Sequence, residues 1–257
     1  MGLFDMFKKK ECSICGGEIG LLGNRKLEDG NMCKECANKL SPWFSDRRES
    51  TVAQINEQLK YREENKKAVA AFNTTRTLGQ SKKLLIDEDA RKFMITSAKN
   101  LAEANPDVLD FSQVTGCRLD IDEHSREETT KDKEGKIVSY NPKRYEFYYD
   151  FEMTIHVNHP YFDEMKFKLN SSGVETTNGV AVPMSRKPNP KFNLDYKEYE
   201  ALGKEIEAIF TSARQMIREE VNAAAAPKAA VTCPFCGATT IPDPSGCCEY
   251  CGGSVNG

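Results

Sequence analysis

Cysteines are the residues of this chain whose type and spacing indicate chemistry, and eight of the ten fall into C-x-x-C pairs. Cys12–Cys15 and Cys33–Cys36 lie near the N-terminus, with seventeen residues between the two pairs. Cys233–Cys236 and Cys248–Cys251 lie near the C-terminus, with eleven residues between them. Zn²⁺ takes four soft ligands in a tetrahedron, and a C-x-x-C turn places two thiolates on one side of the metal. The spacing therefore predicts two zinc ions, each bound by four cysteines.

Both predicted sites are closed, because no histidine, carboxylate or water position accompanies the cysteines, and closed zinc sites are structural. Disulfides and redox-active pairs are the alternatives without a metal. A thioredoxin-type pair occurs singly in a βαβ unit, whereas here two pairs share each short segment. An iron–sulfur cluster, which also takes four thiolates, is the alternative metal centre. We expect Cys117 to be buried in a strand, and Cys247 to be a spare thiol that could exchange with Cys248.

The segments around the cysteines predict two small metal-dependent folds, a treble-clef-like zinc finger over residues 11–45 and a zinc ribbon over residues 232–257. Gly16 and Gly237 each follow a cysteine pair, where a tight turn needs positive φ. In the first segment Leu27–Gly30 predicts a hairpin turn. Cys33–Leu40 predicts a short helix with the second pair in its first turn, where the helix dipole favours thiolates. Four nearby cations can offset thiolate charge: Arg25, Lys26, Lys34 and Lys39.

Between the cysteine segments, the sequence predicts a helical spacer over residues 46–73 and a β domain over residues 74–222. We expect the charged middle of the spacer, Lys60–Lys67, to be solvated. The polar stretch Glu123–Gly135 predicts a long hairpin loop between two strands. The predicted strands are Thr74–Leu78, Lys83–Asp87, Arg91–Thr96, Gln113–Asp122, Arg144–Asn158 and Glu164–Asn170.

A helix follows the strands, with Asp195 as its predicted N-cap and Glu198 three residues later. The apolar stripe of this helix is Tyr199, Leu202, Ile206, Ile209, Ala213, Met216 and Ile217. An alanine-rich linker over residues 223–231 leads to the ribbon. Six or seven antiparallel strands with one amphipathic helix favour a pleckstrin-homology-like (PH-like) barrel or sandwich. The predicted fold class is therefore α+β, with the β domain flanked by two zinc modules.

Catalytic patterns are not found in the sequence. It contains no P-loop, no G-x-S-x-G elbow and no H-E-x-x-H pair. The histidines are His124 in a predicted loop, and His156 and His159 around a strand end. His156 falls on the strand face opposite the aromatic side chains, so a surface position is its simpler interpretation. The neighbouring carboxylates Asp120 and Asp122 fit a strand that enters a polar loop. We therefore expect no enzyme activity.

Charge and the chain start limit the classes of partner. The formal net charge of −3 gives no global attraction to nucleic acid or anionic lipid, and residues 232–257 contain no lysine or arginine. The first residues combine apolar and basic side chains, and Leu3, Phe4, Phe7 and Lys8 suit a peripheral membrane contact or a contact with a partner, although a loosely packed chain end is the simpler interpretation. The sequence shows neither a secretory signal nor an apolar run long enough to span a bilayer. Paired thiols then favour a cytoplasmic protein.

Several stretches of the N-terminal segment resemble the cysteine domain of a bacterial family of unknown function. They are Cys12–Gly23, Lys26–Gly30 and Cys33–Cys36. In that family the cysteine domain often continues into a PH-like region, and Asp110–Gly116 is similar to a strand entry of such β domains. The resemblance implies zinc binding at the four N-terminal cysteines and implies no activity.

Closed metal sites without catalytic residues favour a non-enzymatic adaptor that presents rigid surfaces to protein partners, which can include partners at a membrane surface. Nucleic-acid binding is one alternative, because zinc ribbons often serve it and the N-terminal segment is the more basic of the two. A redox-sensing chaperone that releases zinc on oxidation is another.

Overall fold

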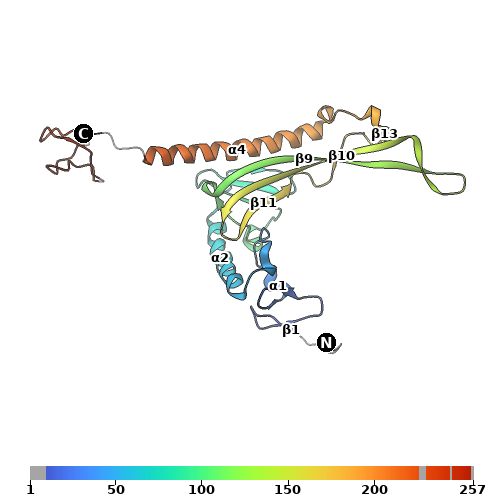
Figure 1. Cartoon of the computed structure of the whole chain (residues 1–257), viewed down its shortest axis with the longest axis horizontal. Helices are drawn as coiled ribbons and strands as arrows, with labels where there is room; N and C mark the ends of the chain where they lie inside the picture. Colours follow the sequence, from blue (N-terminus) through green and yellow to red (C-terminus); the bar gives the residue numbers. More distant parts are fainter. Residues whose placement is uncertain (1–9, 226–229, 244, 256–257) are drawn as a thin grey trace. The chain divides into compact units, whose positions relative to one another are not determined.

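The computed structural model describes residues 10–225, 230–243 and 245–255 (Figure 1). The chain divides into two compact units, Met1–Arg214 and Gln215–Gly257, and each is described by itself. The predicted membrane contact at Leu3, Phe4, Phe7 and Lys8 lies outside the described residues. Among the described helices, none combines the length and the apolar character needed to cross a membrane.

The first unit begins with two short hairpins and a helix. Strand β1 (Lys10–Glu11) pairs with β2 (Glu18–Ile19), and β3 (Arg25–Lys26) pairs with β4 (Asn31–Met32), both antiparallel. Helix α1 (Lys34–Ala37) follows, and a 3-10 turn, η2 (Asp46–Arg48), comes next. We call residues 10–50 the N-terminal cysteine module. Its order of turn, hairpin and helix is the one that the sequence predicted.

Helix α2 (Val52–Ala71) completes the core of this module. Thr51 caps the helix, because its hydroxyl accepts from the backbone N–H of Gln54 while the Gln54 side chain accepts from the backbone N–H of Thr51. Ile55 is fully buried in one cluster with Leu27, Met32 and other module residues. The first half of α2 therefore packs onto the cysteine module.

The middle of α2 is solvated on one face, as expected, but its other face is buried. Arg62 is buried, and its guanidinium makes an ion pair of 2.6 Å with the buried carboxylate of Asp107. The same guanidinium donates to the backbone oxygens of Lys39 and Asn105. The sequence did not predict that this face of α2 is buried. A buried charge whose partner lies far along the chain adds nothing to the apolar periodicity from which a buried helix face is predicted.

The first sheet of the unit is antiparallel, in the order β5-β6-β7-β8. Its strands are β5 (Arg76–Leu78), β6 (Lys83–Asp87), β7 (Lys92–Thr96) and β8 (Leu109–Asp110). Helix α3 (Leu101–Ala104) lies between β7 and β8, and the turn η3 (Phe111–Gln113) follows β8. Residues 84–87 and 93–96 are buried in unbroken runs, so both faces of the central strands are covered.

The second sheet is built on β10 (Ile137–His159), which pairs with β9 (Val114–Lys131) and β11 (Phe162–Lys168). Two short strands, β12 (Val174–Glu175) and β13 (Val182–Pro183), also pair with β10. The two sheets are hydrogen-bonded separately and neither closes on itself, so the described residues form no closed barrel.

Part of the predicted hairpin loop is strand. We expected a loop over Glu123–Gly135, but β9 continues to Lys131 and only Asp132–Lys136 forms the turn. Only the tip of the hairpin, where Thr129–Lys131 pair with Ile137–Ser139, runs beyond the rest of the sheet as a two-stranded ribbon (Figure 1). Closer to the sheet, ion pairs such as Arg126–Glu146 join β9 to β10. Because the side chains of β9 beyond Ile121 are mostly exposed on both faces, the alternation that marks a half-buried strand is missing there.

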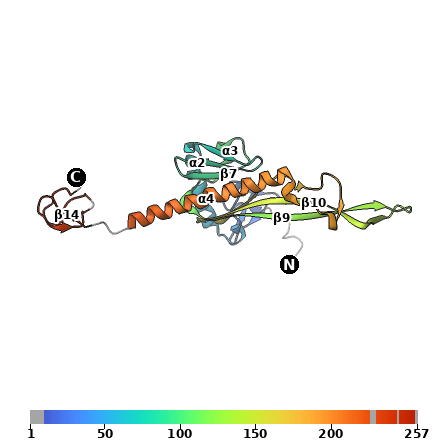
Figure 2. The same cartoon turned by 90° about the horizontal axis from the view of Figure 1, so that it is seen from above.

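Helix α4 spans Leu194–Ala225, and its part up to Arg214 covers the β domain and runs along β9 and β10 (Figure 2). Phe210 contacts Phe93 and Phe111, with ring centroids 4.9 and 5.7 Å away. Tyr196 contacts Phe151 of the second sheet at 5.0 Å. The helix therefore packs on both sheets, and Phe210, which the predicted stripe omitted, is its central buried residue.

The N-cap of α4 lies two residues before the predicted one, Asp195. The Asn193 side chain accepts from the backbone N–H of Tyr196 at 2.9 Å, which is the contact of an N-cap. Asp195 lies in the first turn, where the helix dipole stabilises a negatively charged carboxylate. Two 3-10 turns, η4 (Met184–Arg186) and η5 (Pro190–Phe192), lead into the helix.

The second unit contains the C-terminal cysteines. Strand β14 (Val231–Thr232) pairs with β15 (Thr239–Thr240), and an isolated bridge joins Cys247 to Ser254. We call residues 230–255 the C-terminal ribbon. Its buried side chains are few, and two of them are cysteines: Cys233, Thr240 and Cys248.

Candidate metal centres

The four cysteines of the N-terminal module lie together. One Sγ atom from each of Cys12, Cys15, Cys33 and Cys36 falls in a group whose members are all within 4.8 Å of one another. Cys15 is exposed and the other three are buried. The turn between β1 and β2 carries the first pair, and Cys33 caps α1 so that Cys36 lies within that helix.

The four cysteines of the C-terminal ribbon form a second group of the same kind, again with all Sγ atoms within 4.8 Å. The Sγ atoms of Cys233 and Cys251 are 3.5 Å apart, and those of Cys236 and Cys248 are 3.7 Å apart. The two sites therefore match in donor set and spacing. They are the only such groups of three or more histidine, cysteine or acidic residues in the part of the chain that the structure describes.

Three of the four C-x-x-C pairs are held by one type of turn. After Cys12, the N–H of Gly16 donates to the Cys12 oxygen at 2.8 Å, and the N–H of Cys12 donates to the oxygen of Gly17. The same two hydrogen bonds recur after Cys233 and after Cys248. In each turn the glycine after the second cysteine has positive φ: Gly16 at 72°, Gly237 at 74° and Gly252 at 71°.

The backbone favours ionised sulfur at the first cysteine of the turn. Burial opposes ionisation of Cys12, but backbone N–H groups of Cys15, Cys33 and Ile14 outweigh it and lower the thiol pKa to about 6. One of these donors, the N–H of Cys33, lies 3.2 Å from the Cys12 Sγ. Burial and the neighbouring thiols raise the pKa of Cys36 instead. One thiolate therefore forms readily in this cluster, and further ionisation is opposed unless a cation offsets the charge.

In the ribbon, too, the pKa is lowered for one cysteine and raised for another. Burial opposes ionisation of Cys233, but backbone N–H groups lower its pKa to about 7. At Cys251 one backbone N–H favours the thiolate, but hydrogen bonds with Cys236 and Cys233 outweigh it and raise the pKa to about 12. Both clusters thus bring together thiols that compete for a proton, as expected of groups that share a bound cation.

A tetrahedral metal fits the sulfur geometry. Metal–sulfur bonds of about 2.3 Å give a tetrahedron with edges of about 3.8 Å. The sulfur separations of 3.5 and 3.7 Å in the ribbon, and of 3.9 Å between Cys15 and Cys33, lie close to that edge. None of the cysteines forms a disulfide, for which the two sulfurs would be about 2.05 Å apart. Each group can therefore hold one metal ion with all four positions filled by protein.

The other two cysteines lie outside both groups. The Cys247 Sγ is 4.0 Å from the oxygen of Ser245, and Cys248 is the member of the ribbon group. Cys117 lies on β9 opposite Ile155 and is half-buried rather than fully buried as expected. Burial and the charge of Glu207 raise its pKa to about 12.

The histidines join no metal group among the described residues. His124 lies 3.4 Å from the carboxylate of Asp150, and His156 is half-buried on β10. His159 stacks on Phe162 at 4.1 Å and meets the edge of Tyr61. Burial lowers the pKa of His159, as expected for a ring packed among aromatic side chains.

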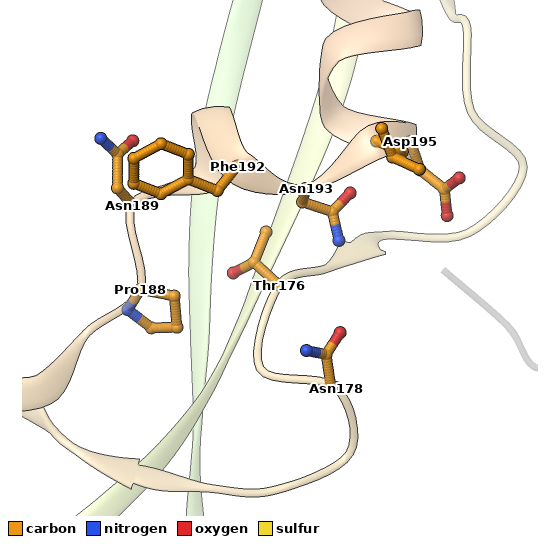
Figure 3. A pocket seen from close by; sticks show the side chains of 8 residues that line it. Thr176, Asn178, Pro188, Asn189, Phe192, Asn193 and Asp195 are labelled. Atoms are coloured by element: carbon orange, nitrogen blue, oxygen red, sulfur yellow. The ribbon is translucent and has the colours of Figure 1, made fainter.

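A shallow pocket lies where α4 begins (Figure 3). Its lining consists mainly of amide and apolar side chains, and Asp195 is its one ionisable residue. Asn193, which caps the helix, also donates to the backbone oxygen of Glu175 at 3.1 Å. With no nucleophile and base side by side, this lining offers polar contacts and no evident chemistry.

Comparison with known families finds one match. The model of a domain of unknown function (DUF4428) matches residues 10–58. This confirms the resemblance of the N-terminal cysteine segment to a family of unknown function. The matched stretch also includes Ile55, whose side chain packs into the module from α2. No curated protein and no solved structure matches the chain.

Proposed function

We propose that this chain is a non-enzymatic adaptor in which two structural zinc ions hold small modules that bind protein partners. One observation carries the proposal: in each cysteine group all four donors are thiols of the chain, within 4.8 Å of one another. A metal bound by four protein ligands has no open position for a substrate or a reactive water. The metal then acts on the fold, and the function lies in surfaces that the fold presents.

Zinc is the metal that suits the donors best. Four thiolates in a tetrahedron suit zinc or iron, and a turn with glycine at positive φ after the second cysteine serves both. Zinc neither changes redox state nor needs an assembly pathway for a cluster. Elemental analysis of the purified chain should find two zinc ions per molecule, and the visible absorption of an iron–sulfur cluster should be missing.

We also propose that the β domain is PH-like. Four strands in one sheet, three main strands in the next and a C-terminal helix over both support it. Because fold does not fix function, this analogy adds no ligand to the proposal.

The C-terminal ribbon offers a surface for a protein partner. Phe235 and Tyr250 occupy the same position in the two turns, one residue before the second cysteine, and each is 72% exposed. Exposed aromatic side chains are enriched where proteins meet. The ribbon segment, residues 232–257, contains no lysine or arginine, so it has no side-chain cation for nucleic-acid phosphates.

The test is quantitative capture of partners by the tagged full-length chain from native lysate. The double variant Phe235→Ala/Tyr250→Ala should lose its specific partners while it keeps two zinc ions. Phe192→Ala, which removes an exposed aromatic from another part of the chain, is the matched control and should retain them. Equal capture by the wild type and the ribbon variant would count against the ribbon surface. A purified chain without stoichiometric metal would overturn the proposal itself.

A further inference from the structure

A pair of leucines is left in solvent at the edge of the N-terminal cysteine module. Leu21 and Leu22 lie in the loop between β2 and β3, and their exposed fractions are 86% and 94%. The loop is closed by a hydrogen bond of 2.9 Å from the N–H of Gly23 to the oxygen of Gly20. We call residues 20–23 the leucine tip. Since the module buries Leu27 and Met32 completely, its core does not use the tip.

Four cations lie at the base of this tip. Arg25, Lys26, Arg47 and Arg48 line one open cleft, in which Glu28 is the only acidic residue. We call these four the cation rim. The guanidinium of Arg25 donates to the backbone oxygen of Leu22 at 3.4 Å, so the rim begins directly beneath the leucines. Arg47 donates to the backbone oxygen of Lys26 at 2.5 Å, which holds η2 against β3.

The four charges of the rim lie close together. Among the described residues, no carboxylate oxygen forms an ion pair with any of the four. Burial and then the like charges of Arg48 and Arg25 lower the pKa of Arg47, and the charge of Glu49 opposes this shift only in part. Four cations that share a cleft with one acidic residue, Glu28, attract an anionic surface, and they are pre-positioned for it by the fold.

We propose that the leucine tip and the cation rim together dock the chain on an anionic lipid surface. The leucines would enter the boundary between headgroups and acyl chains, while the cations contact lipid phosphates. A free phosphate or a nucleic acid would satisfy the rim but would leave both leucines in water, and the pairing of the two features therefore favours a membrane. This inference goes beyond the proposed function, since it names a second surface that does not involve the ribbon.

The experiment is sedimentation of the zinc-loaded full-length chain with phosphatidylcholine vesicles, with and without phosphatidylserine. Binding should require phosphatidylserine and weaken as salt is raised. Leu21→Ser/Leu22→Ser should reduce the affinity at least tenfold. Lys26→Gln/Arg48→Gln should also reduce the affinity for these vesicles more than tenfold, because each cation near the lipid surface contributes a factor of roughly five. Both variants replace exposed side chains, and retention of two zinc ions will show that the module is folded.

Matched controls are Val180→Ser, an exposed apolar residue elsewhere, and Lys133→Gln, an exposed cation in the turn between β9 and β10. Both should bind within twofold of the wild type. If the leucine variant binds as well as the wild type, the proposal is wrong, whatever else holds the chain to the vesicle. If only the cation variant loses binding and oligonucleotides compete, the rim is a nucleic-acid site instead. Partner capture through Phe235 and Tyr250 is a separate readout, so failure here leaves the adaptor proposal standing.

Discussion

The two cysteine groups have the same donors and similar sulfur distances, but their surroundings differ. Around the N-terminal group, a hydrophobic cluster joins the cysteines to Leu27, Met32 and Ile55. In the C-terminal ribbon, Cys233 and Cys248 are themselves most of what is buried. Segments this short seldom fold on apolar burial alone. The comparison indicates that a metal would supply nearly all of the stability of the ribbon, but only part of the stability of the module.

The N-terminal module is also tied to the rest of its unit by polar contacts. Asp107 accepts from Ser41 at 2.8 Å, within the module, and pairs with Arg62 of α2. Asn65 donates to the backbone oxygen of Pro106 at 2.8 Å, next to Asp107. The module, α2 and the segment before β8 therefore meet at one carboxylate. Loss of metal at the N-terminal site should therefore also destabilise the contacts that Asp107 makes with the module and with α2.

The largest expected effect comes from removing one ligand at each site. Cys36→Ser and Cys248→Ser should each lower the zinc content from two ions to one. Structural zinc supplies on the order of 10 kcal/mol of folding free energy in isolated fingers. We expect Cys36→Ser to lower the thermal transition of the first unit, because Ile55 and its neighbours lose their packing. Cys248→Ser should unfold the ribbon and leave that transition in place, as circular dichroism and calorimetry can show.

Equal destabilisation of the first unit by both variants would break this comparison. So would a Cys36→Ser chain that melts like the wild type, because the module would then be as separable as the ribbon.

The next largest effect should come from the buried ion pair. Asp107→Ala leaves the guanidinium of Arg62 buried without its partner, which typically costs about 3–5 kcal/mol. Glu63→Ala removes an exposed ion pair with Lys66 on the same helix and should change the free energy of unfolding far less, because solvent screens the pair. Urea denaturation of zinc-loaded protein measures both. Similar midpoints for the two variants would show that α2 is the loosely attached spacer that the sequence suggested.

A smaller effect is expected at the glycines of the three matching turns. Gly16→Ala, Gly237→Ala and Gly252→Ala each place a side chain at positive φ, at a cost of about 1–2 kcal/mol. Gly20→Ala is the control, because its backbone has no positive φ and its added methyl meets nothing within 4 Å. Chelator titration should show weaker zinc retention in the three turn variants. A greater loss in the ribbon variants than in Gly16→Ala would sharpen the contrast between the sites.

The local features of this fold could be predicted from the sequence, and the long-range contacts could not. The spacing of the cysteines and the glycine after three of the four pairs identified both groups, since a C-x-x-C turn is set by neighbouring residues. Strand alternation likewise located β10. The polar face of α2 was missed because Arg62 finds its partner, Asp107, forty-five positions away. The strand beyond Glu123 was missed because a ribbon exposed on both faces carries no periodic signal.

The smallest effect is expected at the two cysteines outside the groups, and it tests which thiols bind metal. In zinc-loaded protein at pH 8, iodoacetamide should label Cys247, while Cys117 reacts slowly because its pKa of about 12 keeps it protonated. Labelling of Cys117 should accelerate as the pH rises towards that value, since the thiolate is the nucleophile. Cys247→Ser should abolish the fast label and keep both zinc ions. A Cys247→Ser chain with one zinc ion would mean that Cys247, and not its neighbour Cys248, completes the ribbon site. The two sites would then differ in their ligand pattern as well as in their surroundings, because the second pair of the ribbon would no longer be a C-x-x-C turn.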